Sequence, residues 1–454
     1  MPDILLVILA VIFVLGIAIN IHEFGHFIVA KILGMRVEAY SFFGLGPRIW
    51  GFKYGHTDYR ISAIPLGAYV KLYGDEATAA LEGGESDGEK VPDSELYELR
   101  PRWQKFLVMV GGPFMNILLA LAIPFTVAMM YGVPSMPAPI VGVVESGGAA
   151  EQAGIRSGDR IIAFNGHADP AWENINDEAM ISPEQALPVT VDRGGQKLDL
   201  TVTPQKVMQD GNGIGQIGFK PDSGVEPVEV GLVVPDSPAA ASGLQVGDRA
   251  IAFNGSTVRN ADELTALIRD NKDQPGTLTV DRNGQRVELQ TQAKLSDDGV
   301  YRIGASFGAA SFSKRVDVGL GGAAAFAYES NMRIIKLTGK VFGQMFSGQR
   351  SVKDAGLAGP VGIVQIIAKV VREAGFAGLV GILAVISLNL GVFNLLPIPL
   401  LDGGQIAVLG IEKVMSWFGA TLSMAVKEKI QLAGLGIILL LMVFTLFLDI
   451  SKFF

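Results

Sequence analysis

The chain of 454 residues contains no cysteine and only four histidines. Without cysteine, neither a disulfide framework nor a thiolate zinc site can form. Any bound metal ion must therefore be held by histidine and carboxylate side chains. Charged residues are also scarce, at 18%, and the net charge is −8. This acidic balance argues against nucleic acid as a partner, because a surface that binds phosphates needs an excess of basic side chains.

Charged side chains are missing altogether from residues 4–19, 106–130, 374–401 and 432–448. A helix needs roughly 17–25 mainly apolar residues to cross the hydrocarbon core of a bilayer. A run such as 435–447 is apolar on every face, which is not typical of a helix in a soluble protein. The sequence therefore predicts a multi-pass α-helical membrane protein with four transmembrane helices, over 1–33, 106–133, 374–401 and 432–449.

The basic residues near these helices predict their orientation. Lys31, Arg36 and Arg48 lie near the start of the first connecting segment, 34–105, and Arg100, Arg102 and Lys105 lie at its end, whereas no Lys or Arg precedes the first helix. Short loops rich in Lys and Arg stay in the cytoplasm. We therefore expect 34–105 and 402–431 to be cytoplasmic, and both termini and the long segment 134–373 to lie outside.

The long outer segment contains an internal repeat. Residues 154–166 recur at 243–255 with nine of thirteen positions identical, and Val-Asp-Arg followed by a glycine turn occurs in both copies. Each copy alternates short β-branched runs with glycine turns, which is typical of hairpins. We predict two tandem α+β domains, over 134–222 and 223–300, inserted between the second and third helices. They resemble PDZ domains, which bind extended peptides at a sheet edge; spacers without ligands are the alternative.

Residues 301–373 differ from the repeats in charge and in pattern. Basic side chains outnumber acidic ones here, and apolar residues recur at helical spacing. This pattern predicts an amphipathic helical linker. A basic amphipathic helix can lie on the outer membrane surface, but an ordinary linker helix fits the pattern nearly as well.

The first predicted helix contains His22-Glu23-Phe24-Gly25-His26. At about 100° per residue, His22, Glu23 and His26 share one helix face. Two imidazoles four positions apart can bind one metal ion, and the glutamate between them can act as a general base toward water. Ionisable groups at membrane depth are costly, so they are usually paired, metal-bound or functional. The sequence therefore predicts a metal site within the membrane.

A catalytic zinc ion needs a third protein ligand and one open position. The best-placed carboxylate at membrane depth is Asp402, which follows Pro397 and Pro399 and precedes Gly403-Gly404. The prolines break the third helix and the glycines permit a tight turn, which can direct Asp402 back into the helix bundle. An ordinary helix N-cap is the alternative role for this residue.

These motifs resemble those of the site-2 proteases. The resemblance rests on His-Glu-x-x-His, on Gly-Gly-Pro-Phe-Met-Asn at 111–116, on 394–404 and on the two repeats, and it covers essentially the whole chain. It implies one zinc ion per chain, held by His22, His26 and Asp402, with Glu23 activating water. It also implies that Asn394 contacts or orients the substrate.

The segment 59–72 alternates polar and apolar residues around Pro65 and Gly67. This pattern predicts a β-hairpin whose edge can hold an unwound substrate segment as an added strand. The candidate substrate-binding residues are Ile61, Ser62, Ala63 and Gly67. The resemblance implies a hairpin that dips into the membrane, whereas an ordinary cytoplasmic hairpin is the alternative.

The resemblance further implies regulated intramembrane proteolysis in a bacterial inner membrane, as part of a stress response. The implied substrates are single-pass membrane proteins already shortened on the outer side, such as an anti-sigma factor, and signal-peptide remnants. The repeats and both termini would be periplasmic, with the metal site toward the cytoplasm. The competing class is a membrane-anchored peptide sensor with a non-catalytic metal. A metal transporter needs a series of polar sites along a path, and the sequence offers one cluster.

Overall fold

The computed structural model describes residues 2–42, 44–64, 67–74, 91–134, 138–209, 212–222, 224–225, 227–296, 300–309, 315–354, 356–420 and 422–451. The chain divides into two compact units. The first comprises Met1–Gly132, Asp317–Lys340 and Leu357–Phe454, and the second comprises Val133–Val316 and Val341–Gly356.

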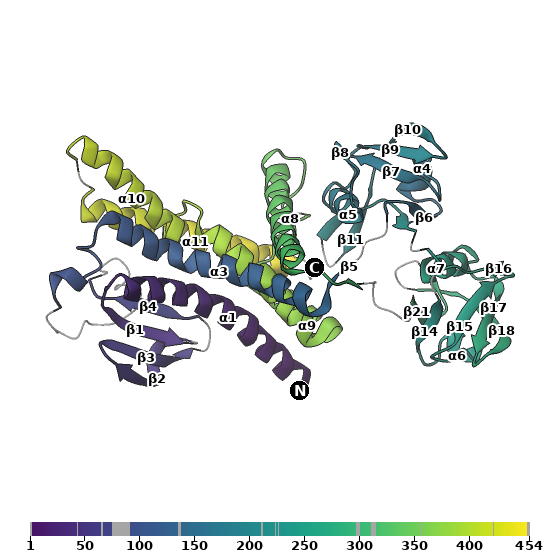
Figure 1. Ribbon diagram of the computed structural model, residues 1–454, viewed down its shortest axis with the longest axis horizontal. Helices are drawn as coiled ribbons and strands as arrows, with labels where there is room; N and C mark the ends of the chain where they lie inside the picture. The colour runs from purple at the N-terminus through teal and green to yellow at the C-terminus, as the bar shows by residue number, and fades with distance from the viewer. Residues whose placement is uncertain are drawn as a thin grey trace. The chain divides into compact units, whose positions relative to one another are not determined.

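The first unit combines long helices with one small sheet (Figure 1). Its elements are α1 (Pro2–Ile32), β1 (Val37–Phe42), β2 (Leu45–Tyr54), β3 (Thr57–Ile64), β4 (Tyr69–Leu72), the 3-10 helix η1 (Asp93–Glu95), α3 (Arg102–Tyr131), α9 (Pro360–Asn394), α10 (Asp402–Trp417), α11 (Met424–Ser451) and, as far as Lys340, α8 (Leu320–Phe346).

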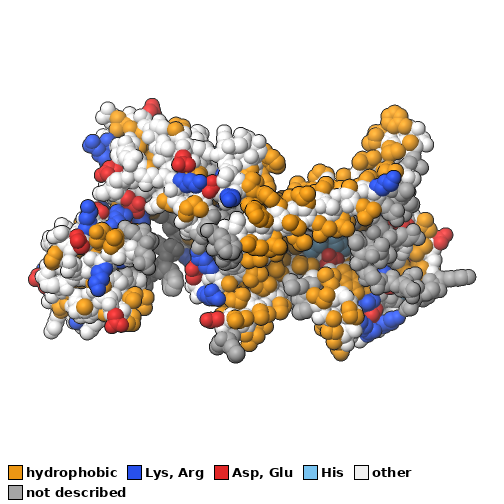
Figure 2. All heavy atoms as spheres, turned by 180° about the vertical axis from the view of Figure 1, so that it is seen from behind, with side chains coloured by type: hydrophobic (Ala, Val, Ile, Leu, Met, Phe, Trp, Pro, Cys, Tyr) orange, Lys and Arg blue, Asp and Glu red, His pale blue; other side chains and the backbone are white. Residues whose placement is uncertain are grey.

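Four helices in the described part of the chain are long and apolar enough to cross a membrane: Asp3–Ile32, Arg102–Tyr131, Pro360–Asn394 and Lys429–Ser451. Apolar side chains cover the visible face of these helices (Figure 2). On α11, Leu440, Val443 and Phe447 are each more than 60% exposed. Large apolar side chains without protein neighbours are expected where a helix faces lipid. The number of helices that can span a membrane thus agrees with the predicted four.

The third spanning helix differs from its prediction at both ends. α9 begins at Pro360, and Gly375 breaks its helical geometry with φ 59° and ψ −147°. The helix then ends at Asn394, seven residues before the predicted limit of 401. Pro397 and Pro399 follow, and proline cannot continue a helix because it lacks a backbone N–H and clashes with the preceding turn.

Close backbone contacts hold the membrane helices together. A Cβ atom at Gly25 of α1 would collide with the Gly111 carbonyl of α3, and one at Gly391 of α9 would lie 2.9 Å from the Pro113 carbonyl oxygen of α3. Small residues let membrane helices approach closely enough for backbone packing. α3 is therefore packed against both α1 and α9.

The sheet of the first unit has the strand order β2-β3-β1-β4. β1 pairs with β3 in parallel, with Ala39 opposite Asp58, and with β4 in the antiparallel sense, with Tyr40 opposite Val70. The predicted hairpin over 59–72 is therefore wrong, since β1 lies between its two arms; residues 65 and 66 lie outside the described part. The hairpin in this sheet is β2–β3, and β4 is an edge strand.

The second unit contains the two repeats. Its elements are β5 (Val133–Pro134), β6 (Val141–Val144), α4 (Ala149–Gln152), β7 (Arg160–Phe164), β8 (His167–Ala168), α5 (Trp172–Ile181), β9 (Leu187–Arg193), β10 (Gln196–Val202), β11 (Gln205–Gln209), β12 (Asn212–Gln216), β13 (Phe219–Pro221), β14 (Val228–Val233), α6 (Pro238–Ala241), β15 (Arg249–Phe253), β16 (Ser256–Thr257), α7 (Ala261–Asp270), β17 (Pro275–Arg282), β18 (Gln285–Gln292), β19 (Lys294–Leu295), β20 (Tyr301–Arg302), β21 (Ala305–Ala309) and β22 (Arg315–Val316).

The two repeats share one order of elements. β7, β8 and α5 of the first copy correspond to β15, β16 and α7 of the second, at the same offset along the chain. Each copy has its own apolar core, around Phe164 in the first and Phe253 in the second. β21 pairs with β14, so the second copy extends past its predicted end at 300, because its sheet needs this later strand.

An identical ion pair stabilises both copies. Arg193 donates from Nε and Nη2 to the two carboxylate oxygens of Asp159, at 2.7 and 2.8 Å. Arg282 makes the same bidentate contact with Asp248, at 2.7 and 2.6 Å. Burial alone would raise the pKa of each aspartate, but the hydrogen bonds from arginine outweigh it and hold the pKa below its ordinary value. These pairs explain why the arginine of Val-Asp-Arg and the aspartate of Gly-Asp-Arg recur in both copies.

The predicted linker over 301–373 contains the helix α8. Its residues Ala323, Ala327 and Asn331 are buried at a spacing of four. Asn331 Nδ2 donates to the Ala120 carbonyl of α3 at 3.0 Å. This part of α8 is therefore a packed helix of the first unit; the linker role and a position on the membrane surface both stay predictions.

Candidate active site

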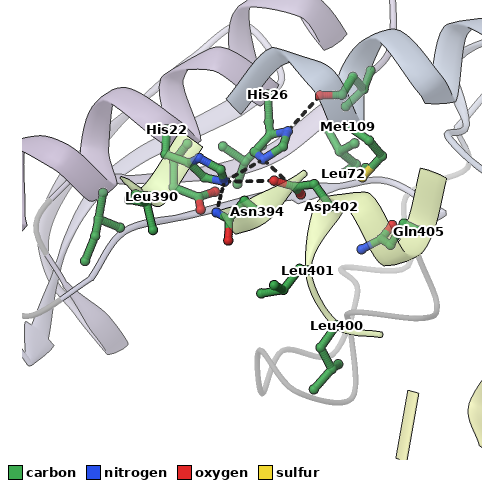
Figure 3. Close-up of a pocket in the computed structure, with 14 residues that line it drawn as sticks. His22, His26, Leu72, Met109, Leu390, Asn394, Leu400, Leu401, Asp402 and Gln405 are labelled. Atoms are coloured by element: carbon green, nitrogen blue, oxygen red, sulfur yellow. Dashed lines mark hydrogen bonds and ion pairs between the residues drawn. The ribbon is translucent and has the colours of Figure 1, made fainter. Parts of the chain in front are cut away.

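A cavity of about 320 Å³ lies in the first unit, where α1, α3, α9 and the start of α10 meet the edge strand β4 (Figure 3). Its lining joins titratable, amide and apolar side chains from distant parts of the sequence. The lining residues are Ile19, His22, Glu23, His26, Val70, Leu72, Val108, Met109, Leu390, Asn394, Leu400, Leu401, Asp402 and Gln405.

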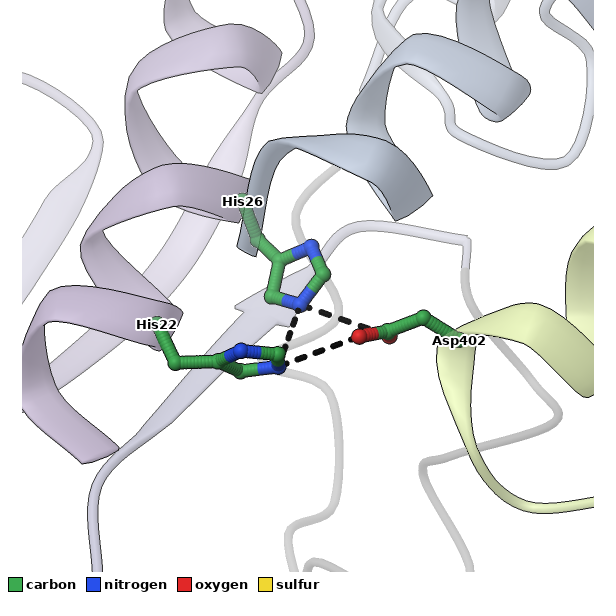
Figure 4. Close-up of side chains that lie close together, drawn as sticks. All are labelled: His22, His26 and Asp402. Carbon is green, nitrogen blue, oxygen red and sulfur yellow. Dashed lines mark hydrogen bonds and ion pairs between the residues drawn. The ribbon is translucent and has the colours of Figure 1, made fainter. Parts of the chain in front are cut away.

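His22, His26 and Asp402 point toward one another at this cavity (Figure 4). The Nε2 atoms of the two histidines are 3.2 Å apart. Asp402 Oδ2 lies 3.1 Å from His22 Nε2, and Asp402 Oδ1 lies 3.4 Å from His26 Nε2. The structure thus brings together the three predicted metal ligands, from the first spanning helix and from the first residue of α10.

The segment between α9 and α10 directs Asp402 into the cavity. Leu400 adopts a positive φ of 78°, which is strained for a branched side chain. A Cβ atom at Gly403 would collide with the carbonyl oxygens of Leu395 and Leu396, and one at Gly404 with that of Ile398. The two glycines therefore let the first turn of α10 pack directly onto the preceding loop. The tight turn expected from the Pro and Gly residues is present.

These three side chains fit a zinc ion. Two ligands at about 2.0–2.1 Å from zinc in tetrahedral geometry lie about 3.3–3.4 Å apart. The Nε2–Nε2 distance of the two histidines, and the contact that each makes with one of the two Asp402 oxygens, are close to this value. Two histidines and one carboxylate are a known ligand set of catalytic zinc, which keeps one position open. Among the described residues, Asp402 Oδ2 is buried with the ion-pair contact to His22 Nε2 but without a hydrogen bond, and a buried carboxylate oxygen requires a partner.

Two further contacts orient the imidazoles. Val108, on α3, accepts a hydrogen bond from His26 Nδ1 through its carbonyl oxygen at 2.7 Å. Asn116, also on α3, places its amide nitrogen Nδ2 3.3 Å from His22 Nδ1. Both contacts engage Nδ1, so the Nε2 atoms face Asp402. The sequence pointed to 111–116 as a family motif but assigned no role to Asn116.

Glycine provides the space that the histidines occupy. A Cβ atom at Gly112 of α3 would collide with His26 Nε2 and lie 2.9 Å from His22 Cε1. The contact of Gly25 with Gly111 brings α3 to this distance from α1. The adjacent glycines in the sequence indicated this close packing. Gly111 allows the contact between α3 and α1, and Gly112 leaves space for the two imidazole rings.

Glu23 and Asn394 lie where the predictions expect them. Glu23 lines the cavity beside the two histidines. Asn394, the last residue of α9, has its Nδ2 atom 3.2 Å from His22 Nε2. A carboxylate and an amide are therefore available next to the three donor atoms, to act on water and on substrate.

The predicted substrate-binding residues of the segment 59–72 do not line the cavity. Ile61, Ser62 and Ala63 belong to β3, which β1 separates from the edge strand, and Ser62 is buried and hydrogen-bonded to Ser41 at 2.9 Å. Gly67 precedes β4 and is likewise absent from the lining. Val70 and Leu72 of β4 line the cavity instead. They are two positions apart, so they share one face of the strand, and the alternation of polar and apolar residues in the sequence could have pointed to them.

Comparison with known proteins decides the family. Residues 10–441 match peptidase family M50. The chain belongs to this family. A Vibrio cholerae protein that carries a zinc metalloprotease name is 30% identical, with complete coverage of both chains. Proteins named regulator of sigma-E protease RseP are also 30% identical: that of Salmonella typhimurium with 98% of each chain covered, and that of Escherichia coli K12 with 96% of this chain and 97% of its own.

The family membership confirms the resemblance to site-2 proteases and the prediction of a zinc metalloprotease. With the relatives and the apolar helices, it places the protein in a bacterial inner membrane with a role in regulated intramembrane proteolysis. A solved PDZ domain of the Listeria monocytogenes SdrC-like protein covers 18% of the chain at 20% identity and a TM-score of 0.17. The non-catalytic sensor is disfavoured, since the family is one of peptidases.

Proposed function

We propose that this chain is an intramembrane endopeptidase that uses one zinc ion per chain to cleave single-pass membrane proteins. The observation that carries the proposal is the meeting of His22, His26 and Asp402 beside helices that can cross a membrane. A cluster of three metal-binding side chains among apolar helices is costly unless it is functional.

Each residue of the site has a role in this proposal. His22, His26 and Asp402 hold the zinc ion, which when bound supplies Lewis-acid chemistry at the scissile carbonyl. Glu23 takes a proton from the attacking water and returns it to the leaving amine, as a general base and then a general acid. Asn394 donates from its amide to the substrate and orients it. No cysteine takes part, since the chain has none.

The substrate must be extended before it can be cleaved, because a helix hides its carbonyl groups in its own hydrogen bonds. β4 is an edge strand, and Val70 and Leu72 place it beside Glu23 in the cavity lining. An unwound substrate segment can add to this edge through backbone hydrogen bonds. We therefore propose that the substrate segment pairs with β4 and not with the predicted hairpin.

The natural substrates we propose are anti-sigma-factor-like proteins already shortened on the outer side, and signal-peptide remnants. The two repeats, as PDZ-like domains, would lie in the periplasm with both termini, and the metal site would lie toward the cytoplasm. There the repeats can bind peptides and can act as a size gate that keeps bulky outer domains from the metal. The acidic balance of residues 140–300, with 24 acidic and 13 basic side chains, is compatible with export.

The test is cleavage of a purified single-span substrate in detergent, with the wild type and Glu23→Gln. We expect chelator to stop cleavage by the wild type. Glu23→Gln should retain zinc but lose at least about 10²-fold in rate, the usual contribution of general acid–base catalysis. Glu288→Gln, on the exposed face of β18, is the matched control and should cleave normally. Full activity in Glu23→Gln, or in chelator, would contradict the proposal.

A further inference from the structure

Asn116 lies on the side of His22 that faces away from the other metal-binding atoms. Its side chain is completely buried, and its amide nitrogen Nδ2 is placed 3.3 Å from His22 Nδ1. No role in the proposed mechanism accounts for this amide. A buried polar side chain at membrane depth needs a reason to be there, because an apolar residue would be less costly.

The direction of His22 determines what Asn116 must do. His22 Nε2 is the atom that faces Asp402, at 3.1 Å, and His26, at 3.2 Å. A neutral imidazole carries one N–H, so a ring that offers Nε2 to a metal carries its hydrogen on Nδ1. The group that faces His22 Nδ1 must then be a hydrogen-bond acceptor.

The same argument applies to His26, whose hydrogen-bond partner can only be an acceptor. The Val108 group 2.7 Å from His26 Nδ1 is a backbone carbonyl oxygen, which can only accept. His26 Nδ1 therefore carries the hydrogen, and its Nε2 is free to bind a metal. The two histidines are thus held through Nδ1, one by a carbonyl of α3 and the other by a side chain of α3.

Asn116 can supply the acceptor if its amide oxygen faces the ring. The two amide atoms differ only by a half-turn about the Cβ–Cγ bond. The oxygen Oδ1 is buried without a hydrogen bond among the described residues, so no other contact opposes this half-turn. Either orientation leaves one amide atom unpaired, and the imidazole therefore decides between them: two facing N–H groups repel, whereas N–H and C=O attract.

The backbone of Asn116 is held by its neighbours. Ser387 of α9, itself completely buried, donates from Oγ to the Asn116 carbonyl oxygen at 2.9 Å. A Cβ atom at Gly391 would lie 3.3 Å from the Asn116 Cβ, so α9 packs directly against this point of α3. The side chain is therefore presented to His22 from a fixed position.

We infer that Asn116 is a positioning residue for the zinc site: its amide oxygen accepts the hydrogen of His22 Nδ1 and so directs His22 Nε2 to the metal. This role rests on the proposed zinc site. Outer partners of metal-bound histidines typically contribute about 10–100-fold to metal affinity. The same loss is expected here when the acceptor is removed.

The experiment measures zinc affinity by chelator competition on the full-length protein in detergent, with the visible spectrum of the cobalt-loaded form as a second readout. Asn116→Leu removes the acceptor at similar size and should bind zinc about 10–100-fold more weakly, with an altered cobalt spectrum. Asn116→Asp keeps an oxygen but cannot donate, so it should restore affinity to nearly the wild-type value. Asn116→Ala replaces the leucine variant if that protein does not purify as a single species.

Asn174→Leu is the control, because it makes the same substitution at an exposed position of α5 in the second unit. It should keep the wild-type zinc affinity. Wild-type affinity in both Asn116→Leu and Asn116→Ala would overturn the role, and so would an equal loss in Asn116→Asp and Asn116→Leu. A wild type that binds no zinc would instead overturn the proposed zinc site, and this role with it.

Discussion

At the scale of single residues, the absence of a side chain at Gly112 is as important as the ligands. Gly112→Ala would place a methyl group against His26 Nε2. Alanine favours a helix over glycine by about 1 kcal/mol, so α3 itself should not be weakened. The imidazoles must move, and we expect at least roughly tenfold weaker zinc binding, as for other changes that misplace metal-bound histidines. Chelator competition measures this loss.

The matched control is Gly381→Ala. Gly381 is also a glycine inside a spanning helix, but a Cβ atom there meets nothing within 4 Å. This variant should bind zinc like the wild type. Equal zinc affinity in Gly112→Ala and the wild type would show that the rings do not occupy the position seen here.

The sequence pointed to the three side chains that the structure brings together, but not to the residues that support them. His22, Glu23 and His26 lie within five positions of one helix, so helical geometry alone places them together. Asp402 followed from the need for a third donor at the same depth. The roles of Gly112 and Asn116 depend on the distance between α1 and α3, which no local pattern determines.

At the scale of elements, the edge strand β4 should guide the substrate. Because the chain has no cysteine, Val70→Cys introduces a single thiol beside the cavity. In the Glu23→Gln background, this thiol should form disulfides with cysteines placed along the substrate, at every second position near the cleavage point. An added strand gives a period of two, since successive side chains point to opposite faces. Gel analysis of the cross-linked products gives the pattern.

Phe52→Cys is the control for this cross-linking. Phe52 is on β2, at the opposite edge of the same sheet, and is 54% exposed. It should give few cross-links. Equal yields at both edges, or a period of three to four residues, would mean that the substrate stays helical or binds elsewhere.

The ion pairs of the repeats predict a pH dependence. The pKa of Asp248 lies below its ordinary value in the folded protein, so the pair stabilises the fold above the unfolded pKa of about 3.9 and this stabilisation is lost as pH falls through the folded pKa. Asp248→Asn should lower stability at pH 7 by about 1.5–3 kcal/mol, the range for hydrogen bonds to charged groups. The difference in stability between Asp248→Asn and the wild type should decrease below pH 4. Hydrogen exchange of the β17 and β18 amides measures the stability of both proteins.

The control for this dependence is Asp281→Asn. Asp281 precedes Arg282 on the same strand, and its carboxylate accepts from the Gly284 backbone N–H instead of from arginine. The stability of the Asp281→Asn variant should follow the wild-type pH profile more closely than that of Asp248→Asn does. A constant difference between Asp248→Asn and the wild type from pH 7 to pH 3 would contradict the assigned cause.

The elements themselves differed in how far they could be predicted. The spanning helices follow from runs without charge, a local property that needs no partner. The small sheet was missed in part, because β1 inserts between β3 and β4 by pairing in parallel with one and antiparallel with the other. Such an order depends on contacts between distant segments, so alternation within 59–72 suggested a hairpin that does not form.

At the scale of the whole molecule, the chain joins a metal site among apolar helices to a unit built from two repeats. If the repeats act as a size gate, a variant lacking residues 142–294 should cleave a substrate that still carries its folded outer domain. The wild type should cleave this substrate at least about tenfold more slowly than the shortened form, whereas the deletion variant should cleave both at similar rates. Cleavage of the two substrates in the same detergent gives the ratio.

The deletion must leave the catalytic site intact for this comparison. Zinc content and the rate on the shortened substrate serve as controls, and both should match the wild type. Selectivity that survives the deletion would mean that the repeats do not exclude large substrates.

The proposed function requires one zinc ion held jointly by the first spanning helix and the start of α10. Elemental analysis of the purified protein, as wild type and as Asp402→Ala, measures this zinc. We expect one zinc per chain in the wild type and far less in the variant, since removal of one of three proposed ligands leaves only His22 and His26. A wild type without zinc, or a variant with undiminished zinc, would contradict it.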